Sequence, residues 1–169
     1  MPPHRVPLTV TLVVACLLAV PAAASACAGA KAPVRSNLAR AASATHCLVN
    51  AARARSGLRR LRDAGALDHA AGAHARDMVR RDFFDHMSPS GSTPKQRARS
   101  AGYRGGSIGE TIAWSAGAAT PAAIVAMWMR SAPHRQVLLA GGFDAIGVGI
   151  ARGAPGRHGG ATFTADLGS

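Results

Sequence analysis

The chain contains one glutamate, Glu110, and two histidines lie at equal distances from it along the sequence. His86 precedes Glu110 by 24 residues and His134 follows it by 24 residues. Imidazole and carboxylate groups transfer protons near neutral pH, and they also bind divalent metals such as Zn²⁺. If the fold brings these three side chains together, they form a cleft that is suited to acid–base or metal chemistry.

The sequence around each of the three residues predicts how it is positioned. Residues 85–92 are turn-forming types, so we expect His86 to lie on a loop. Glu110 stands between a glycine-rich loop and a predicted strand around residues 112–114. His134 directly follows a proline and should lie in the first turn of a short helix, where the helix dipole keeps the ring neutral.

Other segments with helical periodicity should form the framework of the domain. We expect helices over residues 37–56 and 65–81, and further helices that begin at Thr93, Thr120 and Ser131. In the second helix Asp68 is a candidate capping residue. The first helix is predicted to pack through one face, made of Cys47, Leu48, Ala51 and Ala54.

Two C-terminal segments alternate large apolar residues with small or polar ones, which predicts strands over residues 145–150 and 161–167. Residues 152–160 should be a flexible connection between them. With the strand around residues 112–114, they would form a small antiparallel sheet that helices cover on both sides.

The first 26 residues have the pattern of an export signal. His4 and Arg5 precede an apolar run over residues 8–20, and Ala24-Ser25-Ala26 offers a cleavage site. The apolar run is shorter than the roughly 20 residues that cross a bilayer as a helix. We therefore expect residues 1–26 to be a signal peptide and the rest to be one secreted domain, without a transmembrane segment, that begins with an extended leader over residues 27–38.

Cysteine usage agrees with an oxidising compartment, because Cys16 lies in the predicted signal and leaves Cys27 and Cys47 as a pair. We favour a disulfide between them, which would tether the leader to the first helix. The alternative is lipidation of Cys27, which would anchor the protein at the cell surface.

The chain is strongly basic, with a net charge of +12 that falls to +11 without Arg5 of the predicted signal. Acidic wall polymers or anionic lipids are natural partners for such a surface. The arginines, among them Arg53, Arg55, Arg59 and Arg60, are scattered over helix faces without interleaved aromatic residues. Because single-stranded nucleic acids are bound by stacking on aromatic side chains, we do not expect a nucleic-acid partner.

The order of these segments resembles the CAP superfamily (cysteine-rich secretory proteins, antigen 5 and pathogenesis-related proteins) in its bacterial SCP-like branch, with residues 39–169 as the CAP domain. No single motif is specific, but their order and spacing are. The motifs that carry the resemblance are Leu48-Val49-Asn50-Ala51, His74 with Asp77-Met78, Phe83-Phe84-Asp85-His86-Met87-Ser88-Pro89-Ser90-Gly91, Gly102-Tyr103, Gly109-Glu110-Thr111-Ile112-Ala113, Trp128-Met129, Pro133-His134-Arg135 and Ile146-Gly147-Val148-Gly149.

The resemblance implies an α+β fold, a three-layer α/β/α sandwich with a small antiparallel central sheet. It also implies a cleft with two histidines and two acidic residues. His86, Glu110 and His134 match three of these four positions. The fourth acid has no counterpart after Trp128, where Met129, Arg130 and Ser131 follow.

Three hypotheses about function follow. The first is a secreted, monomeric binding module without an organic cofactor, whose cleft binds Zn²⁺ through His86 and His134, with Glu110 as third ligand or as a hydrogen-bond acceptor behind them. Its ligand would be a small molecule or a lipid. The second is a metal-dependent hydrolase with Glu110 as the general base. The third is a cationic binder of anionic cell-wall polymer or lipid. We favour a binding module over an enzyme because the cleft lacks a second acid in sequence.

Overall fold

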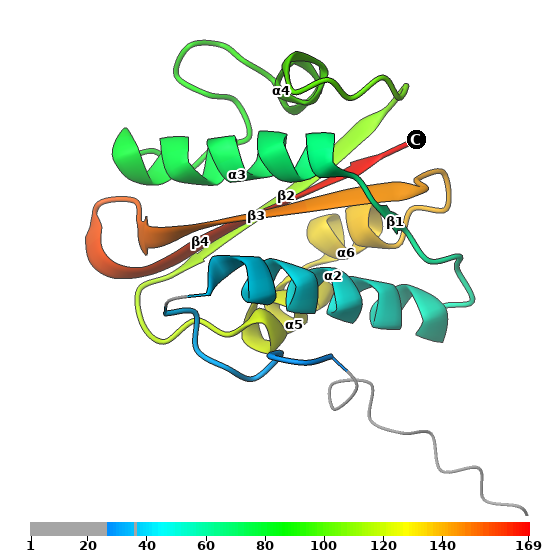
Figure 1. Cartoon of the computed structure of the whole chain (residues 1–169), viewed down its shortest axis with the longest axis horizontal. Helices are drawn as coiled ribbons and strands as arrows, with labels where there is room; N and C mark the ends of the chain where they lie inside the picture. The colour runs from blue at the N-terminus through cyan, green and yellow to red at the C-terminus, as the bar shows by residue number, and fades with distance from the viewer. Residues whose placement is uncertain (1–26, 36) are drawn as a thin grey trace, which may run out of the picture.

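The structure, a computed structural model, describes residues 27–35 and 37–169. The predicted signal peptide, residues 1–26, therefore lies outside the described residues. The elements, labelled as in Figure 1, are α2 (Leu38–Arg55), β1 (Arg62–Asp63), α3 (Gly65–Arg80), α4 (Pro94–Ser100), β2 (Ile108–Ser115), α5 (Pro121–Arg130), α6 (Ala132–Leu138), β3 (Ala145–Ala154) and β4 (Arg157–Gly168).

The strands form one sheet in the order β1-β3-β4-β2. Strand β4 pairs antiparallel with both β3 and β2, which confirms the predicted hairpin and its third strand. The hairpin is longer than expected, because β3 continues to Ala154 and β4 begins at Arg157, so most of the predicted flexible connection is strand. The sequence did not predict β1, which pairs parallel with β3, so the sheet is mixed rather than purely antiparallel.

Helices cover both faces of the sheet, so the fold is α+β with three layers (Figure 1). Helices α3 and α4 lie on one side, and α2, α5 and α6 lie on the other (Figure 1). Helix α3 packs unusually close to β3, because a Cβ atom at Gly147 or Gly149 would overlap the α3 backbone at Asp68 or Gly72. Two glycines in the strand therefore allow the backbone of α3, which carries His74, to approach the sheet.

The predicted core face of α2 was right in part, since Leu48 lies in the core and Cys47 packs against it. Leu48 is buried, but Ala54 is exposed, and Cys47 and Ala51 are only half-buried. Arg53, which we had placed on the surface, is 1% exposed. Its guanidinium donates hydrogen bonds to backbone carbonyls beyond the helix, which turns this face of α2 inward.

Asp68 does not cap α3 as predicted. The N-cap position is Ala64, which makes no side-chain hydrogen bond there. Asp68 Oδ1 instead accepts a hydrogen bond of 2.7 Å from the backbone N–H of Val148. The carboxylate therefore joins α3 to β3, since both elements lie close enough for a side chain to reach the strand backbone.

Cys27 and Cys47 form the predicted disulfide, which joins the leader to α2. Two backbone hydrogen bonds also attach the leader near the start of α5, from Val34 N–H to the Ala119 carbonyl and from Ala122 N–H to the Ala30 carbonyl. Among the described residues, the structure contains no helix that is long and apolar enough to cross a membrane.

Candidate functional site

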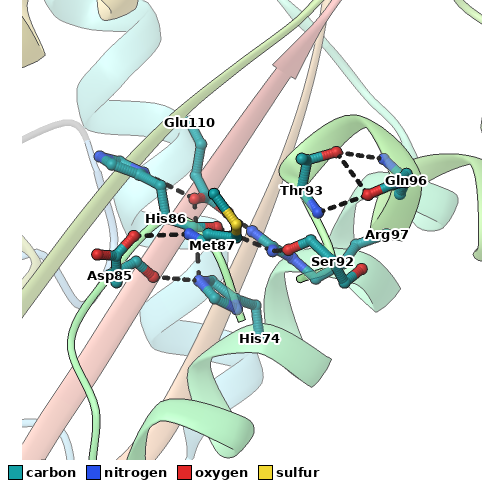
Figure 2. Close-up of polar contacts among 9 residues, drawn as sticks. All are labelled: His74, Asp85, His86, Met87, Ser92, Thr93, Gln96, Arg97 and Glu110. Carbon is teal, nitrogen blue, oxygen red and sulfur yellow. Dashed lines mark hydrogen bonds and ion pairs between the residues drawn. The ribbon is translucent and has the colours of Figure 1, made fainter. Parts of the chain in front are cut away.

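Glu110 was expected just before the strand around residues 112–114, but β2 begins at Ile108 and includes it. Its side chain is only 1% exposed. His86 on the loop after α3 donates from Nδ1 to Glu110 Oε1 over 2.8 Å. Arg97 donates from Nη2 to Glu110 Oε2 over 2.6 Å. Figure 2 shows these side chains meeting from three different elements. Both carboxylate oxygens are therefore occupied by cationic or polar donors.

Arg97 also holds the loop that carries His86. Its Nη1 donates to the carbonyl of His86 over 2.9 Å and to that of Ser92 over 2.8 Å. Helix α4 positions Arg97 through a capping box in which Thr93 and Gln96 bond to each other's backbone (Figure 2). Sequence reasoning predicted this helix start but missed Arg97, because nothing in the pattern separates it from the exposed arginines around it.

His74 is a second residue that the sequence did not place at the site. It was expected to be a surface or packing residue, and it is a buried packing residue of α3, at 1% exposure. Its Nε2 donates to the carbonyl of Asp85 over 3.0 Å and lies 3.9 Å from Glu110 Oε1. Burial lowers the pKa of His74, so the ring is neutral and supports the base of the loop.

His134 lies in the first turn of α6 as predicted, and its Nδ1 is 2.7 Å from Ser131 Oγ. Burial lowers the pKa of His134, and a positive charge on His86 lowers it further. The neutral ring expected from the helix dipole therefore has burial as its main cause. Within the described part of the chain, His134 makes no hydrogen bond or ion pair to Glu110 or His86, so its link to them is electrostatic.

Glu110 and His86 change each other's pKa. Burial alone would raise the pKa of Glu110, but the hydrogen bond from His86 and the charge of Arg97 outweigh it and lower the pKa. The same hydrogen bond raises the pKa of His86. Glu110 is consequently a carboxylate near neutral pH, and it accepts the hydrogen bond from His86 Nδ1–H.

A metal ion needs several donor side chains that converge on one point. In the residues that the structure describes, no group of three or more His, Cys, Asp or Glu side chains is arranged to hold a metal. The Nδ1 atoms of His86 and His134 have hydrogen-bond partners, whereas their Nε2 atoms have none among the described residues. These two Nε2 atoms are therefore available to a ligand. A zinc ion bound by these two nitrogens would need further ligands, because protein zinc sites use at least three protein ligands or complete the set with water.

An apolar groove of about 340 Å³ adjoins His134. It is lined by Phe84, Ile112, Ala113, Trp114, Met127, Trp128, Ser131 and His134. Phe84 and Met127 are exposed, at 44% and 38%, and Met87 beside His86 is 54% exposed. Large exposed apolar side chains that gather at a cleft are typical of a ligand-binding surface.

A mixed sheet between two helical layers, with the buried Glu110 of one edge strand bound by His86 and an apolar groove beside His134, defines an α/β/α sandwich domain. The chain belongs to the CAP, or cysteine-rich secretory protein, family, which it matches over residues 47–166. It is 38% identical over 102 residues to the uncharacterized protein YkwD of Bacillus subtilis. The aligned region covers 60% of this chain and 39% of YkwD.

Solved structures agree with this assignment. An extracellular protein from Bacillus anthracis that contains an SCP domain is 25% identical, with a TM-score of 0.61 over 78% of this chain and 40% of that one. An outer surface protein of Borrelia burgdorferi is 19% identical, with a TM-score of 0.65 over 73% of this chain and 88% of that one, and it shows the shared fold. The chain spans well under half the length of both Bacillus relatives.

Proposed function

We propose that this protein is an extracellular binding module whose cleft holds a divalent metal, zinc first, through the Nε2 atoms of His86 and His134. The observation that carries the proposal is the hydrogen bond of 2.8 Å from His86 Nδ1 to Glu110, because it fixes the ring and leaves Nε2 for a ligand. A metal-binding histidine commonly donates its other ring N–H to a carboxylate in this way.

Glu110 has the role of orienting His86 rather than of binding the metal. Its two oxygens are already engaged by His86 and Arg97. The groove beside His134 would receive an apolar part of the ligand, a small molecule or a lipid. An extracellular location is supported by two similar proteins, an extracellular protein of Bacillus anthracis and an outer surface protein of Borrelia burgdorferi.

The hydrolase alternative depends on Glu110 as the general base. A carboxylate with a lowered pKa and two engaged oxygens is a weak base, so the geometry favours binding over hydrolysis. The cationic alternative depends on net charge and needs no cleft. Turnover that is lost in Glu110→Gln would favour the first alternative, and binding that falls with salt but ignores the cleft variants would favour the second.

Zinc titration by calorimetry tests the proposal. We expect residues 27–169 to take up one zinc at pH 8, and the double variant His86→Ala, His134→Ala to take up none. Uptake should weaken at pH 6, because an imidazole must be neutral to bind a metal and Glu110 raises the pKa of His86.

The matched control is the double variant His69→Ala, His158→Ala. Both histidines are exposed and lie outside the cleft, so this variant should bind zinc like the unmodified protein. Equal zinc uptake by the two double variants, or none by the unmodified protein, would refute the proposed site.

A further inference from the structure

Asp166 on β4 is a second acid beside Glu110. The two residues stand directly opposite each other in the antiparallel pair β2–β4, and residues so placed point to the same face of a sheet. That face is the one covered by α3, because Asp166 also pairs with Gly147, whose Cα faces the α3 backbone. Asp166 is 0% exposed, and neither of its carboxylate oxygens has a hydrogen-bond partner within the described residues.

The two carboxyl groups have unequal surroundings. Arg97 from α4 and His86 from the loop both donate to Glu110 and not to Asp166. His74 of α3 donates to the carbonyl of Asp85. Gly147 of β3 brings no side chain, and Asp68 of α3 faces the Val148 N–H instead. The charge of Glu110 is thus stabilised, whereas a charge on Asp166 would be buried without a donor.

Two neighbouring buried carboxyl groups with one set of donors favour a single negative charge. Burial raises the pKa of Asp166 well above its ordinary value, and the charge of Glu110 raises it further. The direction agrees with the geometry, since an ionised and unpartnered buried carboxylate is costly.

We propose that Asp166 is a positioning residue of the cleft, which stays a neutral carboxylic acid in the folded protein and donates its proton to the carboxylate of Glu110. It would be a third donor to Glu110, which holds the ring of His86. The second acid that the sequence lacks after Trp128 is then supplied by the last strand of the sheet. This inference deepens the proposed function, but its test needs no metal.

The protonation of Asp166 can be observed directly in the metal-free protein. Residues 27–169 with ¹³C-labelled aspartate carboxyl groups, kept in chelator, are titrated by NMR from pH 3 to pH 8, and Asp166→Asn assigns the resonance. We expect the resonance of Asp166 to keep its protonated position at pH 7, because both of its carboxyl oxygens are buried without a donor. An Asp166 resonance that has already moved to its ionised position at pH 7 would overturn the proposal.

The pH dependence of stability gives a second readout. An acid whose pKa is raised by folding makes the protein less stable as pH rises from the unfolded toward the folded pKa. Asp166→Asn removes this loss and keeps a hydrogen-bond donor, so its stability relative to the unmodified protein should increase from pH 4 to pH 8 in urea unfolding. Asp166→Ala removes the donor as well and should be less stable than Asp166→Asn at every pH.

Asp144→Asn is the control for the loss of one acid at an exposed site, and it should not reproduce the rise in relative stability that is expected for Asp166→Asn. If Asp166 had only a packing role, Asp166→Asn would change the free energy of unfolding by the same amount at each pH. That result would contradict the proposal. The titration of the unmodified protein decides the question even if Asp166→Ala does not fold, because only Asp166→Asn is needed to assign the resonance. Zinc uptake is independent of both readouts, so failure of the metal site and failure of this inference are distinguishable.

Discussion

Replacing Arg97 by methionine is expected to lower the free energy of unfolding by about 3–5 kcal/mol, because it leaves the buried charge of Glu110 without its cation. Glu110 is 1% exposed and Arg97 is 10% exposed, so water screens their contact of 2.6 Å only weakly. The change also removes two hydrogen bonds to the loop carbonyls of His86 and Ser92. Urea unfolding followed by tryptophan fluorescence at pH 7 measures the loss.

Arg99→Met is the matched control, since Arg99 lies on the same helix but is exposed. It should change stability by about 0.5 kcal/mol or less. The lowered pKa of Glu110 means that its charge stabilises the fold above the ordinary glutamate pKa and that this contribution is lost as the pH falls. The difference in the free energy of unfolding between Arg97→Met and the unmodified protein should therefore become smaller toward pH 3. Equal unfolding midpoints for the two arginine variants would show that Arg97 does not support Glu110.

The candidate site could be predicted in part because its anchor residues carry local signals. A lone glutamate between glycines and a strand, and a histidine in a run of turn residues, identify Glu110 and His86 without a structure. The hydrogen bond between them confirms that they meet. Arg97, His74 and Asp166 carry no such signal, since each is one of many residues of its type and its role depends on contacts far along the chain.

Asp166 shows most clearly what a sequence pattern does not predict. In sequence it stands in an alternating strand where a polar residue usually faces water. In the structure helix α3 covers that face, so the polar positions of β4, Thr162, Thr164 and Asp166, are all buried. Alternation predicts which residues share a face, but it does not predict what covers the face. The second acid was therefore missed although its strand was predicted.

The fold was easier to predict than the site, and its errors have a common cause. Proline signals placed the starts of α4 and α5, and the alternation of large and small residues predicted the last two strands, although β4 begins earlier than expected, at Arg157. Strand β1 is two residues long, too short for any alternation, and it is a strand only because β3 lies beside it. The core face of α2 was incomplete because Arg53 was grouped with the arginines scattered over helix faces, although its hydrogen bonds to backbone carbonyls hold it inside.

That arginine, Arg53, joins α2 to three backbone carbonyls outside the helix. Its Nη1 donates over 2.9 Å to the carbonyls of both Leu138 and Ala140, and its Nε donates over 3.0 Å to that of Arg59. Leu138 ends α6, the helix whose first turn carries His134. One buried guanidinium thus ties α2 to the end of the helix that holds half of the proposed metal site.

Arg53→Met keeps much of the side-chain volume but leaves these carbonyls without their donor. A buried acceptor that loses its partner costs about 1–3 kcal/mol, so we expect a total loss of about 4 kcal/mol in urea unfolding. Arg55→Met, an exposed change two residues later on the same helix, should cost about 0.5 kcal/mol or less. Because α6 loses its attachment, zinc affinity should also fall in Arg53→Met at a temperature where the variant is still folded. Unchanged stability would mean that water replaces the guanidinium, and unchanged zinc affinity with lost stability would mean that α6 is held by its other contacts.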